Sequence, residues 1–447
     1  MSYKNFITKL FNVNPSDLLK VTDTDRKDGS IILKIRLVAK YNLCPICRTS
    51  GKIHAYYKRE LKHSTFSNRP CIICYEQRRY ICPECSTTFS EPNPFIDTSE
   101  RVTYEAKIVV LKDLKHPEAT YTAVANRYNL SPTKVMRIFD KHVDIARKPL
   151  PRVLSIDEHY FPNSDQNSKY CCLLMDFETG VMLDILPDRK KNYLVGYFGK
   201  IKHSTMDMGT MKSELDNVQY VSIDMYDTYR DIASIFFPKA KVCADSFHVL
   251  KHLTDDFRRL RVRLARNTEN PVLKHLLIKF RYVFDHNKFL DNEPKYNKSL
   301  GMYANYRTIR DTLFNAFEEL RVAYELKEYY IRLNATTSLE DAPEAIDKAI
   351  KAFESSGIVE YEEFYKMLQN WREEIINSFT KINGRRINNS YMESKNKEVG
   401  RLIFSANGFK NFKRTRNRML YCLNEEDTFA LVHYLWLGRP SPIFVLD

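Results

Sequence analysis

The stretch Val218–His252, VQYVSIDMYDTYRDIASIFFPKAKVCADSFHVLKH, contains two short apolar runs that each end in a carboxylate. The first run stops at Asp224 and the second at Asp245, and the helix-like segment between them ends before Pro238. A strand, a crossover helix and a second strand predict a βαβ unit, in which the carboxyl ends of the strands line one crevice. Each aspartate taken alone is more simply explained as the cap of the helix that follows it.

A third apolar run, upstream of this stretch, also leads into acids. The segment 153–159, VLSIDEH, reaches Asp157, and two apolar segments, 169–176 and 181–186, predict the arms of a hairpin with its turn at 178–180. A strand that ends in Asp157, a hairpin and a strand that ends in Asp224 together resemble a ribonuclease-H-like fold. That fold holds metal ions between carboxylates on adjacent strands and a third carboxylate from a helix.

Length and charge limit the class of protein. The 447 residues are enough for two to four domains with sizeable cores. Lys and Arg number 70 against 56 Asp and Glu, and the resulting charge of +14 favours polyanionic partners. The sequence has no signal peptide, no apolar run that could span a bilayer and no internal repeat. We therefore expect a cytosolic protein without membrane contact, in which clustered cysteines bind metal rather than form disulfides.

Cysteine spacing predicts a metal site early in the chain. Two Cys-x-x-Cys pairs lie 35 residues apart, and four thiolates spaced in this way form the tetrahedral zinc site of a zinc ribbon. The segment 76–81 alternates as a strand that delivers the second pair would. The expected zinc ligands are Cys44, Cys47, Cys82 and Cys85.

A third pair, Cys71 and Cys74, competes with this assignment. Alternation along a strand puts residues three apart on opposite faces, so both thiols reach one ion only where the strand bends. Ligand sets that use Cys71, Cys74, His54 or His63 are therefore disfavoured. The other cysteines, at positions 171, 172, 243 and 422, are expected to be small core residues.

Helical patterns follow the second cysteine pair. We expect helices over 104–114 and 120–128, and a third that starts at Ser131-Pro132 and runs to about Arg147. Two short helices joined by a tight turn resemble a helix-turn-helix, although an ordinary three-helix linker has the same pattern. The upstream ribbon and the positive charge favour DNA binding. The second helix of the motif would present Thr133, Lys134 and Arg137 to the major groove.

Basic residues gather again in the second half of the chain. The segment 251–266 predicts a helix able to track phosphates, and the block from there to 384 is helical without a catalytic pattern. The stretch 385–421 holds ten Lys and Arg against two acids, and a helix would place Glu393, Asn396 and Lys397 on one face. Glu393 is either a salt-bridge partner or a third metal ligand. The residues expected to contact DNA here are Arg258, Arg259, Lys395, Lys410, Lys413 and Arg414.

Seven features in one order resemble the bacterial insertion-sequence transposases of the ISL-three group. The likeness covers roughly residues 40 to 425. The features are the zinc ribbon, the helix-turn-helix, Ile156-Asp157-Glu158, Ser222-Ile223-Asp224-Met225, Asp245-Ser246-Phe247-His248-Val249, Glu393-Ser394-Lys395-Asn396 and Asn407-Gly408-Phe409-Lys410-Asn411-Phe412.

The resemblance implies an Asp-Asp-Glu transposase in which Asp157, Asp224 and Glu393 hold Mg²⁺ or Mn²⁺. Two such ions would activate a water and then a DNA 3′-hydroxyl, so that the enzyme cuts strands and joins them to a target. Asp245 and His248 resemble the C/D-x-x-H signature of transposases that carry an insertion between the second and third carboxylates, and a supporting role is expected for both. A rival triad with Asp245 in place of Asp224 stays open, because both aspartates end strands of one crevice.

The predicted fold class is a multidomain α+β and α/β protein. It combines a zinc ribbon, a helix-turn-helix and a ribonuclease-H-like catalytic domain interrupted by an all-helical insertion. The expected partner is double-stranded DNA, at the transposon ends and the target, bound by a homo-oligomer at the nucleoid. Two other functions remain: a DNA-binding regulator with an inert catalytic domain, and a structure-specific nuclease. The expected segments are a lead-in over 1–40 with an amphipathic start at 3–11, the ribbon over 41–92, the helix-turn-helix over 93–148, the catalytic domain over 149–250 and 385–447, and the insertion over 251–384.

Overall fold

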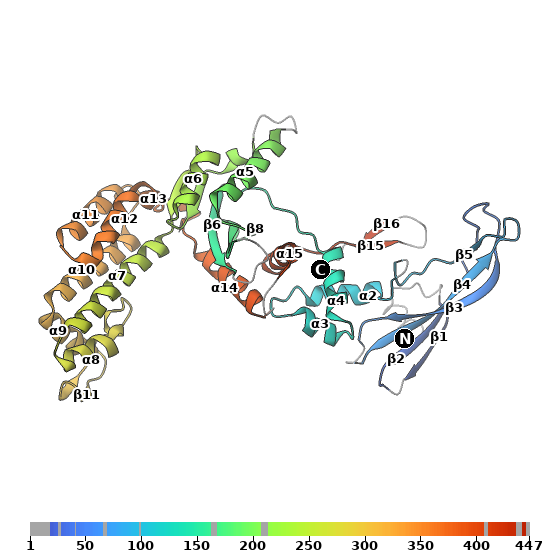
Figure 1. Ribbon diagram of the computed structural model, residues 1–447, viewed down its shortest axis with the longest axis horizontal. Helices are drawn as coiled ribbons and strands as arrows, with labels where there is room; N and C mark the ends of the chain where they lie inside the picture. The colour runs from blue at the N-terminus through green and yellow to red at the C-terminus, as the bar shows by residue number, and fades with distance from the viewer. Residues whose placement is uncertain are drawn as a thin grey trace. The chain divides into compact units, whose positions relative to one another are not determined.

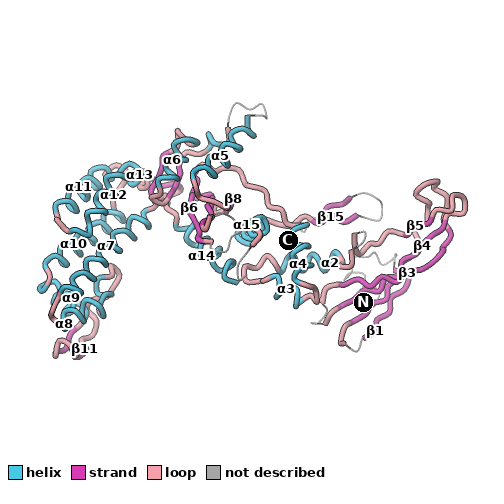
Figure 2. Tube along the Cα trace, in the orientation of Figure 1, coloured by secondary structure: helices cyan, strands magenta, loops and turns pink. Residues whose placement is uncertain are grey.

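The computed structural model describes residues 18–25, 28–40, 42–65, 69–97, 100–161, 168–206, 213–405, 410–434 and 440–443. The expected amphipathic start at 3–11 and the motif residues 407–409 lie outside these ranges. The chain forms two compact units (Figures 1 and 2). The first holds the residues up to Ala146 and those from Glu398 onward, and the second holds nearly all of Arg147–Lys397. No helix in the described ranges combines the length and the apolar character needed to cross a membrane.

The first unit contains a five-stranded sheet. Its strands are β1 (Leu18–Asp25), β2 (Ile31–Leu37), β3 (Lys52–Lys62), β4 (Cys71–Ile81) and β5 (Thr88–Ser90). The central strand β4 pairs in parallel with β2 and antiparallel with β3 and β5, while β1 pairs with β2. Ile35, Ile73 and Tyr75 form a core with Phe95, whereas β3 is an edge strand whose side chains are largely exposed.

Three helices follow the sheet, each with a hydroxyl cap. They are α2 (Tyr104–Asp113), α3 (Tyr121–Arg127) and α4 (Pro132–His142). The side chains of Thr103, Thr120 and Ser131 accept hydrogen bonds from the first turns of these helices, which satisfies backbone groups that have no partner within the helix. Asn129 takes a φ of 50° in the tight turn between α3 and α4, a conformation that asparagine tolerates.

The third of these helices is shorter than expected. The sequence predicted an end near Arg147, which is wrong, because α4 stops at His142 and Val143 has extended backbone angles. The carbonyl of Val143 accepts a hydrogen bond from the Asn417 side chain at 3.1 Å. A partner more than 270 residues away along the chain therefore binds the backbone at the point where the helix ends.

An ion-pair network joins α2 and α4 to the segment before them. The Lys107 side chain, 1% exposed, lies 3.2 Å from Asp97 Oδ2 and also contacts Glu100. Lys141 on α4 reaches the same two carboxylates at 3.1 and 2.9 Å. Burial alone would raise the pKa of Asp97, but hydrogen bonds from Tyr104 and the charges of both lysines lower it to about 2.

Helix α15 (Phe412–Leu423) completes the first unit. The Tyr421 hydroxyl donates to the Leu111 carbonyl at 3.0 Å, and the Arg418 guanidinium donates to the carbonyls of His116 and Ala119 at 2.9 Å each. The expected boundary put 385–447 with the catalytic domain, whereas the structure groups the residues from Glu398 onward with the helix-turn-helix. The hairpin strands β15 (Leu431–Tyr434) and β16 (Pro440–Ile443) follow.

The second unit is built on a mixed five-stranded sheet. Its strands are β6 (Val153–Tyr160), β7 (Tyr170–Asp176), β8 (Met182–Leu186), β9 (Tyr220–Ile223) and β10 (Lys241–Ala244), in the order β10-β9-β6-β7-β8. The predicted βαβ unit and hairpin are confirmed, because β6, β9 and β10 run parallel while β7 and β8 are antiparallel. The connections carry α5 (Lys191–Met206), η2 (Glu214–Asn217) and α6 (Asp227–Phe236). The carboxyl ends of three strands therefore meet at one edge of the sheet.

A helical block separates this sheet from α14 (Ser390–Ser405). One hydrophobic core runs from Leu154 on β6 into the block, where Tyr330, Phe353 and Phe364 pack edge to face. The block belongs to the second unit for this reason. Its helices are α7 (Ser246–Asn267), α8 (Pro271–Lys279), η3 (Arg281–Phe284), α9 (Tyr306–Ala316), α10 (Glu318–Thr336), α11 (Ala342–Ser355), η4 (Val359–Tyr361), α12 (Glu362–Asn370) and α13 (Arg372–Asn377).

The prediction of an all-helical insertion over 251–384 is wrong, because one short hairpin interrupts it and a second lies across its expected end. Strands β11 (Lys295–Asn297) and β12 (Met302–Ala304) pair antiparallel, as do β13 (Lys381–Ile382) and β14 (Arg385–Arg386). Asn383 and Gly384 both have positive φ in the second hairpin. Asn-Gly between two short strands is the usual signal of such a turn, and the sequence analysis overlooked it.

Candidate active site

A cavity of about 500 Å³ lies where β6, β9 and β10 end, beside the first turns of α14. Every residue that lines it belongs to the second unit. The sequence predicted catalytic or supporting roles for five of these residues, on three strand ends and two helices. The acidic residues of the lining are Asp157, Glu158, Asp224, Asp245 and Glu393.

Asp157 is buried near the end of β6. Its Oδ1 accepts a hydrogen bond from the Glu158 backbone N–H at 2.7 Å, and its Oδ2 accepts one from Asn396 Nδ2 at 2.6 Å. Burial, together with the charges of Glu158 and Asp245, raises the pKa of Asp157 to about 7 against the lowering effect of the two hydrogen bonds. Asn396 therefore fixes the orientation of a carboxylate that its surroundings disfavour as an anion.

Asp224 follows β9 directly. It does not cap α6, because that helix starts after Tyr226 and has no side-chain cap, so the simpler explanation of this aspartate is wrong. The Oδ1 atom is buried and has no hydrogen-bond partner among the described residues. Burial and the nearby carboxylates of Glu158 and Asp157 raise the pKa of Asp224 to about 8. A buried, unpaired carboxylate oxygen beside two other acids fits a site that takes a cation.

Asp245 follows β10 and does cap the next helix. One of its oxygens accepts hydrogen bonds from the backbone N–H groups of Phe247 and Asn389, at 3.3 and 3.2 Å. His248 Nε2 lies 3.9 Å from the other oxygen. Burial raises the pKa of Asp245, whereas these hydrogen bonds and His248 lower it. Asp245 therefore connects the start of α7 to the chain segment just before α14.

Glu393 lies in the first turn of α14, half-exposed at the edge of the cavity. Its carboxylate is 3.0 Å from Lys397 Nζ, one helical turn onward. The three predicted catalytic carboxylates line one cavity but do not form a tight cluster. In the described part of the chain, four cysteines have their ligand atoms within 4.8 Å of one another, and no group of three acids is as tight.

An arginine neutralises part of this acidic edge. Arg189 forms an ion pair with Glu158, and its guanidinium lies over the rings of Tyr170 and Tyr226, 4.2 and 4.9 Å from their centroids. Its charge also lowers the pKa of Asp224, although burial and the neighbouring acids outweigh it. Arg189 thus places a fixed positive charge beside the strand ends.

The four predicted zinc ligands gather in the first unit. Sulfur–sulfur distances are 3.5 Å for Cys44–Cys85, 3.3 Å for Cys47–Cys82 and 3.7 Å for Cys47–Cys85. Zinc–sulfur bonds of about 2.3 Å in a tetrahedron would set these distances at about 3.8 Å, so the four thiols fit one zinc ion.

Both cysteine knuckles have the same backbone geometry. In the first, the Arg48 N–H donates to the Cys44 carbonyl at 3.0 Å, and in the second the Ser86 N–H donates to the Cys82 carbonyl at 3.1 Å. Arg48 and Ser86 have φ values of 63° and 56°. Each knuckle therefore turns sharply just after its second cysteine, which points both thiols of a pair to one centre.

The competing ligands lie elsewhere. Cys71 and Cys74 are buried in β4, and burial raises the pKa of the Cys71 thiol to about 11. His63 is buried against the Thr103 hydroxyl at 2.8 Å, and burial lowers its pKa to about 4. His54 is exposed on β3. None of these four residues belongs to the cysteine cluster.

The residues expected to contact DNA divide into two groups. Thr133 and Arg137 are exposed on α4, with Lys134 half-buried beside them, and Arg258 and Lys410 are also exposed. Lys413 is exposed as well, with its Nζ 3.6 Å from Asp144. The others have protein partners or partial cover: Arg414 pairs with Asp140, Arg259 pairs with Asp256 and Glu363, and Lys395 is half-buried.

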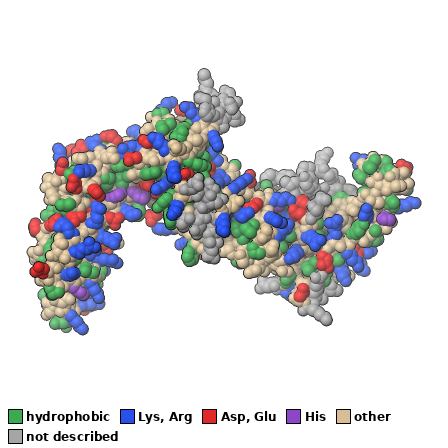
Figure 3. All heavy atoms as spheres, in the orientation of Figure 1, with side chains coloured by type: hydrophobic (Ala, Val, Ile, Leu, Met, Phe, Trp, Pro, Cys, Tyr) green, Lys and Arg blue, Asp and Glu red, His purple; other side chains and the backbone are tan. Residues whose placement is uncertain are grey.

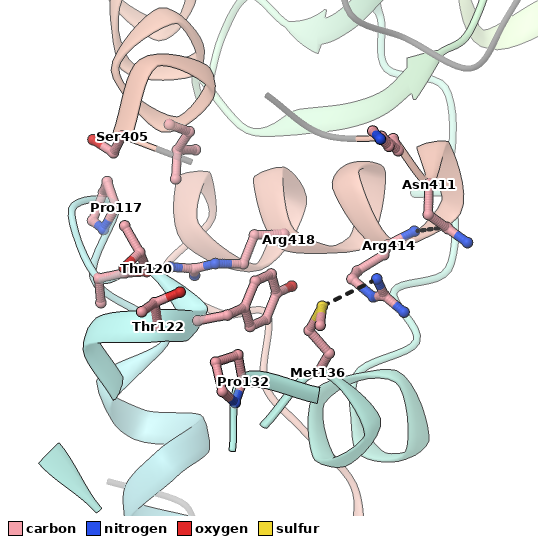
Figure 4. Close-up of a pocket in the computed structure, with 13 residues that line it drawn as sticks. Pro117, Thr120, Thr122, Pro132, Met136, Ser405, Asn411, Arg414 and Arg418 are labelled. Atoms are coloured by element: carbon pink, nitrogen blue, oxygen red, sulfur yellow. Dashed lines mark hydrogen bonds between the residues drawn. The ribbon is translucent and has the colours of Figure 1, made fainter. Parts of the chain in front are cut away.

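A second cavity, of about 370 Å³, lies among α3, α4, α15 and the end of α14 (Figure 4). Arg414 contacts the Met136 sulfur at 3.4 Å, and its backbone N–H donates to the Asn411 side chain at 2.9 Å. Arg418 extends from α15 to the start of α3. Both arginines are thus occupied in holding α15 against the helix-turn-helix.

Two family models match the chain. One, described as a transposase of the ISL3 DDE type, matches residues 154–419, and the other, described as the helix-turn-helix domain of transposase family ISL3, matches residues 91–143. The first match covers more than half of the 447 residues. The chain belongs to the ISL3 family of transposases. No curated protein matches it.

Family membership makes this ISL3 protein a DNA transposase, an enzyme of nucleotidyl transfer. DDE transposases use divalent metal ions, and a helix-turn-helix implies DNA binding. The predicted resemblance is therefore confirmed. The transposase match spans the whole lining of the acidic cavity, from Asp157 to Asn396.

Sequence analysis missed several residues of the ISL3 site. Arg189 lies in a loop after β8 with no motif around it, and Tyr170 is one of many aromatic residues in the chain. Asn389 donates to the Ile156 carbonyl at 3.4 Å as well as to Asp245. The Asn388-Asn389-Ser390 run before a helix was a visible capping signal. Asn396 had been placed on the face of Glu393, but its bond to Asp157 was not foreseen.

Proposed function

We propose that this ISL3 transposase binds the inverted-repeat ends of its insertion sequence and performs metal-dependent strand cleavage and strand transfer. Asp157, Asp224 and Glu393 are the catalytic residues of this proposal. The observation that carries it is their common cavity: two carboxylates at neighbouring strand ends and a third on α14 line one space within the region that matches the transposase family.

We assign the second unit to the ribonuclease-H-like folds. The sheet order β8-β7-β6-β9-β10 supports this, with an antiparallel meander followed by two parallel strands. Asp157 and Asp224 lie on the adjacent strands β6 and β9 or directly after them. The helical block between β10 and α14 would be the insertion that separates the second and third carboxylates.

The donor set fits Mg²⁺ or Mn²⁺, which prefer oxygen ligands and keep open positions for phosphate oxygens. When bound, such ions make a water or a 3′-hydroxyl nucleophilic and stabilise the leaving oxygen. Asp157 and Asp224 would hold them, and the unpaired Asp224 Oδ1 is the strongest local support for a cation site. Asn396 would keep the Asp157 carboxylate turned toward the cavity.

Asp245 and His248 act as supporting residues in this proposal. The two backbone hydrogen bonds to Asp245 support a structural role, because they tie α7 to the residue just before α14. An Asp245→Asn variant should keep strand transfer, since an amide oxygen still accepts these bonds. Loss of all chemistry in that variant, with a normal fold, would favour the rival triad.

The first unit would recognise DNA. Arg137 and Thr133 on the exposed face of α4 are placed for base or phosphate contact, and the ribbon supplies a second element. Synapsis of two transposon ends requires at least two subunits, so we propose a homo-oligomer on DNA.

The test uses purified protein and supercoiled DNA that carries the gene's own flanks, with Mg²⁺ or with EDTA, beside Asp224→Asn. Cleavage at the element ends and joining to new DNA, both abolished by EDTA and by the variant, are the expected results. Cutting without joining would indicate a structure-specific nuclease. Specific binding without cutting, by folded protein with its zinc in place, would indicate a regulator.

A further inference from the structure

The β11–β12 hairpin in the helical block exposes two aromatic rings side by side. Tyr296 and Tyr303 face each other across the strands, with ring centroids 5.5 Å apart and planes at 67°. Their exposed fractions are 56% and 70%, and Met302 beside them is half-exposed. Contiguous exposed apolar surface often marks a site of interaction.

Hydrogen bonds and packing fix the conformation of the hairpin that carries these rings. The Asn297 side chain accepts hydrogen bonds from the Ser299 and Leu300 N–H groups at 3.0 and 3.2 Å, which fixes the turn. Gly301 closes it with a φ of 66°, a conformation open to glycine. Ala304 at the end of β12 is part of the core of the unit. The rings are therefore held on a preformed element rather than on a loose loop.

The positive charge of the hairpin favours nucleic acid as its partner. Residues 294–304 include Lys295 and Lys298, both exposed, and no acid. Lys and Arg side chains lie among hydrophobic ones over this end of the helical block (Figure 3). Protein–protein interfaces are depleted in lysine, whereas sites for unpaired nucleic acid combine aromatic rings with positive charge.

We infer that the β11–β12 hairpin is a stacking platform for an unpaired or end-exposed base of DNA. The inference rests on the proposed function to the extent that strand cleavage creates such bases. A base stacked on an exposed tyrosine would leave its phosphate to Lys298, the exposed cation in the turn of the hairpin. Stacking tolerates any base, so the platform would add affinity without sequence preference.

The test measures equilibrium binding of full-length protein in EDTA, where no cleavage occurs. The probes are a blunt duplex and the same duplex with a short single-stranded 3′ tail that carries 2-aminopurine, whose fluorescence falls on stacking. Tyr296→Ala/Tyr303→Ala should weaken binding of the tailed duplex about tenfold and abolish quenching, with less than a twofold effect on the blunt duplex. Tyr296→Phe/Tyr303→Phe should behave as the unchanged protein, because both rings remain.

Val359→Ala removes a 73%-exposed side chain elsewhere in the same block and is the matched control, for which no change is expected. Equal affinity of the alanine pair and the unchanged protein for the tailed duplex would overturn the inference. So would a change of oligomeric state in that variant with DNA affinity intact, since the hairpin would then contact protein. If the protein quenches 2-aminopurine fluorescence but never cuts DNA, the stacking inference holds and the proposed function is contradicted.

Discussion

Asp224 is a residue whose surroundings favour function over stability. One carboxylate oxygen is buried without a partner among the described residues, and two more acids lie close by. An unpaired buried polar atom costs about 1 to 3 kcal/mol, and more when it is charged. Without a cation, the folded protein is therefore expected to carry local destabilisation at this edge of the sheet.

Asp224→Asn should abolish strand cleavage and yet raise the thermal midpoint of the metal-free protein, since the amide carries no charge. Mg²⁺ should raise the midpoint of the unchanged protein and have little effect on the variant. Thermal unfolding with and without EDTA measures both. Asp227→Asn, at an exposed acid three residues onward, is the control and should give no gain in stability. A lower midpoint for Asp224→Asn would contradict this reading of the site.

Asn396→Ala should weaken catalysis through the metal site rather than through the fold. The amide holds Asp157 at 2.6 Å, and loss of such a neighbour of a ligand typically costs 10- to 100-fold in metal affinity or activity. Cleavage rates measured against Mg²⁺ concentration should show a higher Mg²⁺ requirement that excess metal partly overcomes. Ser394→Ala, exposed on the same helix, should leave the curve unchanged. An unchanged Mg²⁺ requirement in Asn396→Ala would refute the positioning role.

At the scale of elements, α15 is tied to α4 by an arginine that the sequence suggested for DNA. Arg414 donates through two nitrogens to Asp140 on α4. Arg414→Ala is therefore expected to lower stability by about 1 kcal/mol and leave the salt dependence of DNA binding nearly unchanged. Arg137→Ala should lower the slope of log affinity against log salt by about one unit. Equal slopes for the two variants would show that Arg414 also reaches phosphate.

The ion-pair network of α2 and α4 predicts an acid-sensitive first unit. The folded pKa of Asp97, about 2, lies below its value of about 4 in an unfolded chain, so its contribution is present above about pH 4 and lost as pH falls toward 2. Circular dichroism melts at pH 7, 4 and 2.5 should show this loss. Asp97→Asn should flatten that dependence and lower stability at pH 7. If Asp97→Asn and the unchanged protein lose stability in the same way as pH falls, the network is not the source of the acid sensitivity.

Local patterns predicted the elements well where the determinants are local. Apolar runs that end in acids located β6, β9 and β10, and the Ser131-Pro132 cap located the start of α4. The end of α4 was predicted wrongly because it depends on a contact with the distant Asn417. The partner of Arg414 was not predicted because it depends on packing between distant segments. The cavity brings together the predicted acids, whereas Arg189 was missed because only the folded sheet places it beside them.

For the whole molecule, the two units separate two tasks. The cysteine cluster and the helix-turn-helix lie in the first unit, and the acidic cavity lies in the second. The helix α14 belongs to both, with Glu393 and Asn396 before the boundary and the residues from Glu398 after it. Damage to the ribbon should therefore spare the core around the cavity.

Cys44→Ser should lose zinc and end-specific binding while the acidic unit stays folded, because no cysteine of the cluster contributes to its core. Metal analysis of the purified variant measures the first effect. Mg²⁺-dependent stabilisation, measured by thermal unfolding, checks that the acidic site is intact. Cys422→Ser, a cysteine outside the cluster, should keep its zinc. Full zinc content in Cys44→Ser would refute the ligand assignment.

The position of α15 in the chain has a consequence for synthesis. The side of α2 and α4 that α15 covers is complete only after Phe412–Leu423 leaves the ribosome, some 270 residues after α4. At roughly 5 to 20 residues per second, that is a delay of about 15 to 55 seconds. A translation product that stops within the second unit would lack this cover. Such fragments should bind the element's ends weakly. The chains that bind these ends well would then also carry the complete acidic cavity.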